Sequence, residues 1–292
     1  MTVNLQNVDE TIRLFEDAAA ALLSDPKRAG SIVRLPREGH LIISGDLHDH
    51  LIHLDKIRGL ANLESNPNRH VLLQELIHGP NLTHGCDLSY RMLGKVAQEI
   101  LAFPGQVHVI LGNHELAQRT RSGVSKGGGN NVELFNDGLG MIFGTEWTRV
   151  AEAIDRFIDA LPLAVITESG LFCSHSLPAV NVMAHFDTGI LDRTPSEADQ
   201  CGPSGSAYLM VWGRKFTAEH LQTLAEEWDV SMFCVGHAWV EMGVESNLPG
   251  LVAINSDHER GSIISWDLAQ DPSVDELLNR ARYLQTIGSP MV

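Results

Sequence analysis

The chain has 292 residues, is 43% hydrophobic and carries a formal net charge of −16. This length and apolar content suffice for one large α/β domain, and no segment approaches the ~20 apolar residues that span a membrane. The acidic charge argues against general binding to nucleic acid or anionic lipid, because both gain affinity from Lys and Arg. We therefore expect neither a nucleic-acid partner nor a membrane partner.

The four cysteines and the first 30 residues both favour a cytoplasmic location. Residues 1–30 contain no basic stretch followed by an apolar region, so no secretory signal is predicted. Cys86, Cys173, Cys201 and Cys234 have no paired spacing, which indicates reduced thiols. Cys173 and Cys234 lie in apolar, strand-like runs and are predicted to be core residues.

Hydrophobic periodicity predicts alternating helices and strands in the first half of the chain. In chain order we expect a helix at 9–24, a strand at 40–46, a helix at 50–62, a strand at 70–75, a helix at 86–102, a strand at 107–113 and a glycine-rich loop at 122–131.

The second half continues the pattern after a helix at 145–161. Strands are predicted at 163–167, 170–175 and 232–237, strand-like runs at 251–255 and 262–266, and helices at 217–228 and 273–285. Residues 180–206 look irregular, which in a compact domain indicates a functional or disordered loop. The alternation favours one α/β domain over residues 1–292.

Polar side chains follow five of these strands at the point where each ends. They are Asp46 and His48, Glu75, Asn113 and His114, His175, and His237. Taken alone, each has an ordinary explanation: a helix cap for Asp46, a turn for Asn113, a hydrogen-bonded core position for a single histidine. Together they would converge on one crevice, because ligands of open α/β sheets bind beyond the carboxyl ends of strands. Carboxylates, imidazoles and an amide oxygen predict a site for Mn, Fe or Zn.

The segments GDLHD (45–49), GNHE (112–115), His175 and Gly236-His237 resemble, in this order, the motifs of the calcineurin-like metallophosphoesterases. Within them the chain is most similar to the phosphoprotein phosphatase (Ser/Thr phosphatase) family, since the stretch 211–214 resembles the one that bears a later Arg. The resemblance covers about residues 38–268, and we expect the helices 9–24 and 273–285 to pack on this core. It implies an α/β fold, a two-sheet β-sandwich flanked by helices.

The resemblance also implies roles for individual residues. Asp46 and His48 would bind one metal ion, and Asn113, His175 and His237 another, with the carboxylate of the second motif bridging the two ions. His114 would be the general acid that protonates the leaving oxygen, and Arg214 would hold phosphate oxygens. Two metal ions and a phosphorylated substrate, protein or small molecule, are thus implied.

The second motif departs from the family pattern GDxxDRG. Gln74-Glu75 stands in place of Gly-Asp, so the bridging carboxylate would be Glu75, and the orienting acid and the phosphate-binding Arg that follow have no direct match. Asp49 is a candidate for the orienting carboxylate, with a helix N-cap as the alternative. His78 is a candidate contact for the phosphate or the leaving group.

Three further cations, Arg119, Arg121 and Lys126, are candidates to reach the site from the glycine-rich loop, with solvated loop charge as the alternative.

The function that these patterns favour is hydrolysis of phosphomonoesters by a metal-activated water, with phosphoserine or phosphothreonine in proteins among the candidate substrates. A nucleotide or dinucleoside polyphosphate hydrolase is the alternative enzyme. A non-catalytic protein that keeps the fold and binds metal is the alternative outside catalysis, because the second motif lacks its Asp-Arg pair.

Overall fold

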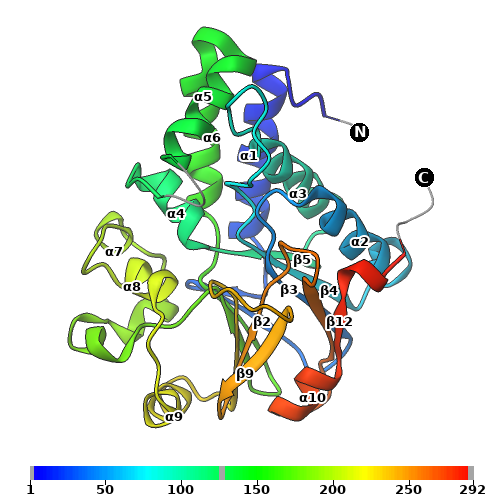
Figure 1. Cartoon of the computed structure of the whole chain (residues 1–292), viewed down its shortest axis with the longest axis vertical. Helices are drawn as coiled ribbons and strands as arrows, with labels where there is room; N and C mark the ends of the chain where they lie inside the picture. Colours follow the sequence, from blue (N-terminus) through cyan, green and yellow to red (C-terminus); the bar gives the residue numbers. More distant parts are fainter. Residues whose placement is uncertain (1–2, 125–128, 289–292) are drawn as a thin grey trace.

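The computed structural model describes residues 3–124 and 129–288. Within these residues two β-sheets pack against each other, and helices cover their outer sides (Figure 1). The expected two-sheet β-sandwich flanked by helices is confirmed.

The larger sheet has the strand order β1-β2-β6-β7-β8-β10-β9. The bounds are Arg28–Ala29 (β1), Ile32–Leu35 (β2), Ala164–Thr167 (β6), Leu171–Ser174 (β7), Met232–Val235 (β8), Val244–Leu248 (β9) and Leu251–Ile254 (β10). Strands β7, β8 and β10 are parallel neighbours, so their carboxyl ends meet at one edge.

The smaller sheet has the order β12-β11-β3-β4-β5. The bounds are His40–Asp46 (β3), Arg69–Gln74 (β4), Val107–Ile110 (β5), Ser262–Asp267 (β11) and Ala281–Tyr283 (β12). Strands β3, β4 and β5 are parallel. Asp46, the last residue of β3, also forms a bridge with Asn255 of the segment after β10, so the two sheets meet at this residue.

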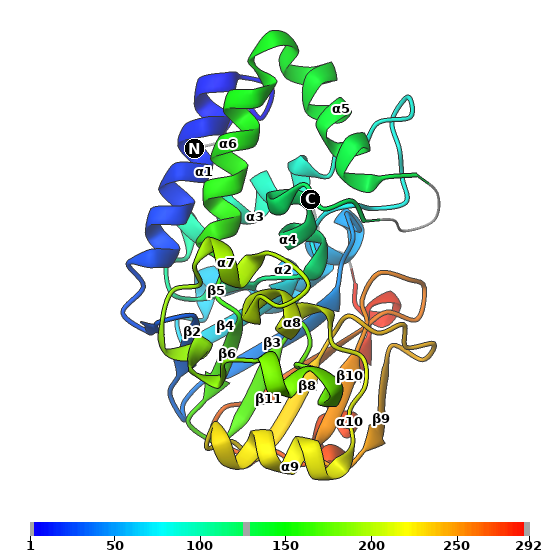
Figure 2. The ribbon, with the colours of Figure 1, turned by 90° about the vertical axis from the view of Figure 1, so that its left-hand side faces the viewer.

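The helices lie at the two ends of the sandwich and along its sides (Figures 1 and 2). The bounds are Val8–Leu23 (α1), Leu51–Ala61 (α2), Tyr90–Ala102 (α3), Asn113–Thr120 (α4), Asn131–Phe143 (α5), Trp147–Asp159 (α6), Glu197–Gln200 (α7), Ser206–Trp212 (α8), Ala218–Glu227 (α9) and Val274–Asn279 (α10). Helix α1 packs on α6 and α3, whereas α9 lies at the opposite end of the molecule (Figure 2). Among the described helices, none combines the length and the apolar character needed to cross a bilayer.

Alternate residues of the strands fill the space between the sheets, as the two-residue period of a strand requires. Leu41 and Ile43 of β3 face Cys173 and Cys234 of the other sheet in one hydrophobic cluster that also contains Trp266. Cys173 and Cys234 are each 1% exposed, so their predicted core positions are confirmed.

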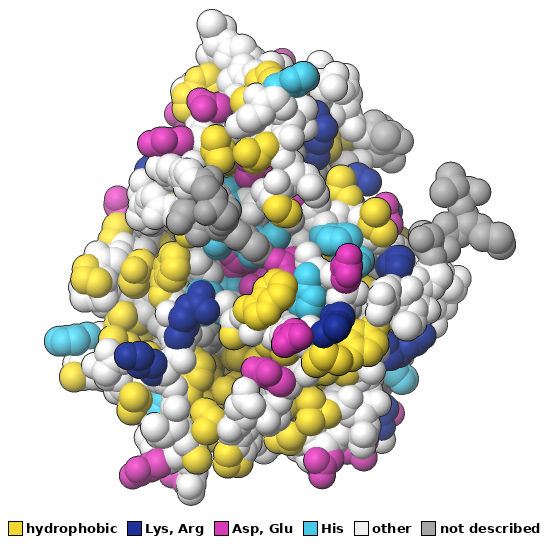
Figure 3. Space-filling view, in the orientation of Figure 1, with side chains coloured by type: hydrophobic (Ala, Val, Ile, Leu, Met, Phe, Trp, Pro, Cys, Tyr) yellow, Lys and Arg dark blue, Asp and Glu magenta, His cyan; other side chains and the backbone are white. Residues whose placement is uncertain are grey.

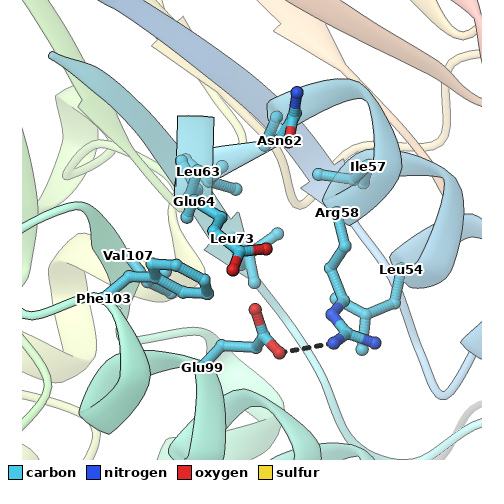
Figure 4. A pocket seen from close by; sticks show the side chains of 12 residues that line it. Leu54, Ile57, Arg58, Asn62, Leu63, Glu64, Leu73, Glu99, Phe103 and Val107 are labelled. Atoms are coloured by element: carbon cyan, nitrogen blue, oxygen red, sulfur yellow. Dashed lines mark hydrogen bonds and ion pairs between the residues drawn. The ribbon is translucent and has the colours of Figure 1, made fainter. Parts of the chain in front are cut away.

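A cavity of about 180 Å³ opens on the helical side of the smaller sheet, between α2 and α3 (Figure 4). Leu54, Leu73 and Phe103 contribute apolar surface, and the ion pair between Arg58 and Glu99, at 2.5 Å, borders it. None of the predicted site residues lines it, so this cavity is separate from the chemistry discussed below.

Two predicted helices have different bounds in the structure. The predicted helix 273–285 is wrong beyond Asn279, because residues 281–283 add β12 to the edge of β11 and tertiary pairing overrides the helical pattern. The predicted helix 86–102 begins only at Tyr90. There Asp87 Oδ1 accepts the Ser89 N–H, and such a local side-chain bond competes with helix formation.

Helices α4, α5 and α8 were not predicted. Gly138 and Gly140 weaken the helical pattern of α5, yet a Cβ at Gly138 would come within 1.9 Å of the Asp87 carbonyl oxygen, so close packing requires this glycine. Helix α8 begins at Ser206, the last residue of the segment 180–206 for which an irregular structure is predicted, and the short helix α7 lies inside that segment.

Candidate metal centre

The five predicted strand ends converge at one edge of the sandwich. Asp46 ends β3, Glu75 follows β4, Asn113 begins α4 after β5, and His175 and His237 follow β7 and β8. All five are at most 7% exposed. Figure 3 shows histidine and acidic side chains together in a hollow in the middle of one face, with Lys, Arg and hydrophobic side chains around it.

Glu75 lies at the centre of this group. Its Oε1 accepts a hydrogen bond from the backbone N–H of His114 at 3.0 Å, and its Oε2 is 2.7 Å from Nε2 of His175. Its backbone oxygen accepts the N–H groups of Leu47 and His48. The side chain and the main chain of Glu75 therefore connect its own strand end to three of the other four.

Beside Glu75, one donor atom from each of three residues lies within 3.2 Å of the other two. Nε2 of His175 is 2.8 Å from Oδ1 of Asn113 and 3.2 Å from Nδ1 of His237, which is itself 2.8 Å from the same Asn113 oxygen. An imidazole nitrogen carries at most one hydrogen and cannot satisfy all these neighbours. A cation among these atoms would satisfy all of them, so the donor set fits a metal ion.

The outer contacts of the histidines also suit metal binding. Nδ1 of His175 is 2.9 Å from Oε1 of Gln74, whose Nε2 donates to the Ser44 carbonyl, so Nδ1 must carry the hydrogen. Nδ1 of His48 is 2.9 Å from the Ile77 carbonyl and must donate likewise. In both rings the lone pair is then on Nε2. A metal-binding histidine needs this arrangement, in which one nitrogen donates to an outer acceptor and the other carries the lone pair that coordinates.

Two sets of donor atoms share Glu75. One set adds Asp46 and His175, the other adds His48 and His114, and within each set all donor atoms lie within 4.8 Å of one another. Asp46 Oδ1 also accepts the His237 N–H at 3.0 Å. Burial raises the pKa of Asp46 to about 7, and the nearby Glu75 adds to the effect although His175 opposes it. Buried acids crowded in this way are stabilised as carboxylates by a bound cation.

Several site residues adopt a left-handed backbone conformation. His48, Asp49, Glu75, His78 and His237 have φ between +40° and +64°. This region disfavours side chains with a Cβ, and residues held there cluster at functional sites. The backbone conformation thus indicates a functional site at the same place as the side-chain chemistry does.

Glycines permit the close approach of the backbone to the carboxylates. A Cβ at Gly112 would lie 2.6 Å from Oε2 of Glu75, and a Cβ at Gly236 would lie 2.4 Å from Oδ1 of Asp46. A Cβ at either position would therefore displace a carboxylate of the donor cluster.

The neighbours of His114 differ from the sequence hypothesis. Nδ1 of His78 lies 3.0 Å from Nδ1 of His114, the position where an orienting group was expected from Asp49. Asp49 instead interacts with the charges of Asp87 and Arg91, and its Oδ1 has no hydrogen-bond partner among the described residues. The alternative helix-cap role of Asp49 is wrong, because His50 caps α2.

The proposed loop cations do not all have a described position. Arg119 pairs with Asp159 at 2.8 Å and Arg121 with Asp155 at 2.8 Å, so both interact with α6. Lys126 lies outside the described residues.

Arg214 borders the candidate metal centre. Its Nη1 donates to the carbonyl oxygen of His237 at 3.1 Å, and the residue is exposed. It lines a cavity of about 580 Å³ together with Lys215, Trp239 and His237. Trp239 is 66% exposed and lies against the His258 ring. Two cationic side chains and an exposed aromatic ring thus lie directly beside a metal-binding candidate.

Sequence reasoning missed Gln74, Glu115 and Gln118. Glu115 Oε1 accepts the backbone N–H groups of Leu76 and Ile77, which fixes the turn after Glu75. Burial, reinforced by Glu75, raises the pKa of Glu115 to about 8. Its position directly after Asn113-His114 was the available signal. Gln118 lies four residues after His114 on α4, and because this helix is not predicted from the sequence, the spacing gave no signal.

No protein-family model matches the chain, and no curated protein matches its sequence. Solved structures do match. A protein serine/threonine phosphatase from Saccharomyces cerevisiae with similarity to human phosphatase PP5 superposes with a TM-score of 0.62 at 11% identity, over 89% of this chain and 82% of that one. A cold-active protein-tyrosine phosphatase from a psychrophilic Shewanella species gives a TM-score of 0.55 at 13% identity, over 81% and 77%. The fold is that of these phosphatases. The fold that the sequence resemblance implied is thereby confirmed on structural grounds.

Proposed function

We propose that the chain is a metal-dependent phosphoesterase that hydrolyses phosphomonoesters. The observation that carries this proposal is the pair of donor sets that share Glu75 at the convergence of five strand ends. The similarity in fold to phosphatases acting on protein serine, threonine or tyrosine adds support for a phosphorylated substrate.

Asp46, His48, Glu75, Asn113, His175 and His237 would together hold the two ions, and Glu75 belongs to both donor sets. Nitrogen and carboxylate donors suit Mn, Fe or Zn. Bound metal ions would supply an activated water and would neutralise phosphate charge.

The protein's own residues act on the substrate. Arg214 is anchored on the carbonyl of His237 and presents its guanidinium beside the donor cluster. Its planar fork matches two phosphate oxygens. Lys215 adds positive charge to the same cavity, which offsets the acidic character of the chain locally.

His114 is the candidate general acid. Its Nε2 lies 3.8 Å from Oε1 of Glu75 and therefore faces the donor cluster. In its imidazolium form this ring carries a hydrogen on Nε2 and can protonate an alkoxide leaving group near neutral pH.

Metal analysis together with turnover tests the proposal. Purified chain should contain two metal ions and hydrolyse p-nitrophenyl phosphate. His114→Asn should lower turnover by about 10²–10⁴-fold while leaving the metal content unchanged. One ion or none, without turnover of any phosphate ester, would instead support the non-catalytic alternative.

A nucleotide or dinucleoside polyphosphate hydrolase is the second candidate, and Trp239 is the observation that favours it. The exposed indole beside Arg214 and Lys215 offers a surface on which a base could stack. A comparison of kcat/KM for a dinucleoside polyphosphate and for phosphoserine distinguishes the two candidates.

A further inference from the structure

His78 is fixed in place by its surroundings. It is 1% exposed, its backbone N–H donates to Oγ of Ser89 at 3.1 Å, and its φ is +62°. Its ring lies edge-on to Phe135, with 5.7 Å between the ring centroids. A side chain held in this way offers its two ring nitrogens in fixed directions.

Both nitrogens of His78 have a partner on α4. Nδ1 is 3.0 Å from Nδ1 of His114, and Nε2 is 3.2 Å from Oε1 of Gln118. Gln118 Nε2 in turn donates to Oδ1 of Asn136 on α5 at 2.9 Å. Because His114 and Gln118 are four residues apart on a helix, they present both contacts from one face.

The direction of each hydrogen bond follows from this series of contacts, which runs from Asn136 through Gln118 and His78 to His114. Since the amide nitrogen of Gln118 donates to Asn136, its oxygen faces His78, and Nε2 of His78 must carry the hydrogen. A neutral imidazole carries only one, so Nδ1 of His78 is an acceptor. His114 must then donate from Nδ1, and its Nε2 is left facing the donor cluster.

The neutral state of His78 agrees with its surroundings. Burial lowers the pKa of His78 to about 4, and the hydrogen bond to Gln118 opposes this only in part.

We propose that His78 is a positioning residue whose Nδ1 accepts the Nδ1–H of His114, a neutral imidazole standing where a carboxylate would otherwise orient the general acid. The neutral His114 ring is then the Nδ1–H tautomer, and the proton that it gives to the leaving oxygen is one that its Nε2 binds in the imidazolium form. The inference rests on the proposed phosphoesterase function for its catalytic meaning, but the tautomer itself can be observed without turnover. It replaces the earlier candidate role of His78 as a substrate contact and removes the need for Asp49.

Nitrogen-15 spectroscopy of the histidine rings tests the tautomer directly. In the full-length metal-free chain at pH 7, long-range proton–nitrogen correlations should show His78 protonated at Nε2 and His114 at Nδ1, with signals assigned from the His78→Asn and His114→Asn variants. A hydrogen on Nε2 of His114 with none on its Nδ1, or His78 protonated at Nδ1, would overturn the proposal. The second outcome would mean that the Gln118 amide has the opposite orientation.

A leaving-group comparison tests the positioning role. His78→Leu removes the acceptor, so kcat/KM for an alkyl phosphate, whose leaving group needs a proton, should fall at least tenfold more than kcat/KM for p-nitrophenyl phosphate. His78→Asn can place its Oδ1 near the position of Nδ1 and should restore most of the alkyl phosphate activity.

His220→Leu is the matched control. This histidine is also buried, and its Nε2 bonds to the carbonyl of Pro178. Its replacement should affect both substrates equally. An equal loss on both substrates for His78→Leu would assign His78 a merely structural role. If the wild type hydrolyses no ester, the proposed function fails, and the spectroscopic result still decides the tautomer.

Discussion

Acid should destabilise the fold through a pair of buried histidines that lies away from the metal centre. His70 of β4 and His108 of β5 are 4% and 1% exposed, and Nδ1 of His70 is 3.0 Å from Nε2 of His108. Burial lowers the pKa of His70 to about 4, with Lys27 contributing and Asp25 opposing. Burial also lowers the pKa of His108 to about 3, with His70 and Lys27 contributing.

The lowered pKa values of His70 and His108 determine how the stability of the fold changes with pH. Well above pH 6.5 both rings are neutral in the folded and the unfolded chain, and the pair does not make stability depend on pH. As the pH falls below 6.5, the unfolded chain takes up protons that the folded chain still excludes, so stability decreases until the folded pKa values are reached. At pH 5.0 the loss is about 2 kcal/mol for each histidine, or about 4 kcal/mol for the pair.

Urea unfolding of the metal-free chain at pH 7.5 and pH 5.0, followed by circular dichroism, measures this loss. The double variant His70→Leu/His108→Leu should show a difference between the two pH values that is about 4 kcal/mol smaller than in the wild type. The control His40→Gln/His84→Gln removes two exposed histidines and should keep the wild-type difference. If the double variant retains the full pH dependence, the pair is not kept neutral by burial and the reasoning is wrong.

Three further predictions concern the metal centre. Glu75→Gln should lower the metal content from two ions per chain to one or fewer by mass spectrometry of the purified protein, and an unchanged stoichiometry would reject a bridging role. Gly236→Ala would place a Cβ 2.4 Å from Oδ1 of Asp46 and should weaken metal binding at least tenfold in equilibrium dialysis; unchanged affinity would show that the loop relaxes. Arg214→Ala should raise KM for p-nitrophenyl phosphate by about tenfold at unchanged metal content, because it removes a charge-assisted phosphate contact. A constant KM would place the phosphate elsewhere.

The strand ends were predictable because each has the same local pattern. An apolar run that stops at a polar residue predicts a buried strand and its exit, and the positions of Asp46, Glu75 and His175 followed from that pattern alone. Their convergence followed from the general placement of ligands at the carboxyl ends of parallel strands.

The partner of His114 could not be read from the sequence in the same way. Whether Asp49 or His78 contacts the His114 ring depends on the left-handed backbone conformation of both residues. Neither residue is a glycine, so their residue types do not predict this conformation. The short strand β12 was missed for a related reason: its three residues pair with β11 only because the fold brings that edge within reach.

The left-handed residues around Glu75 also have a thermodynamic consequence. Five non-glycine residues in that conformation cost on the order of 1 kcal/mol each, a sum comparable to the net stability of many domains. Ions bound to the folded chain alone would raise its stability in proportion to the logarithm of their concentration. The left-handed turns that orient the donor atoms thus lower the stability of the metal-free chain, and bound metal ions would raise it. The fraction of folded chain would then depend on the metal concentration of the surroundings.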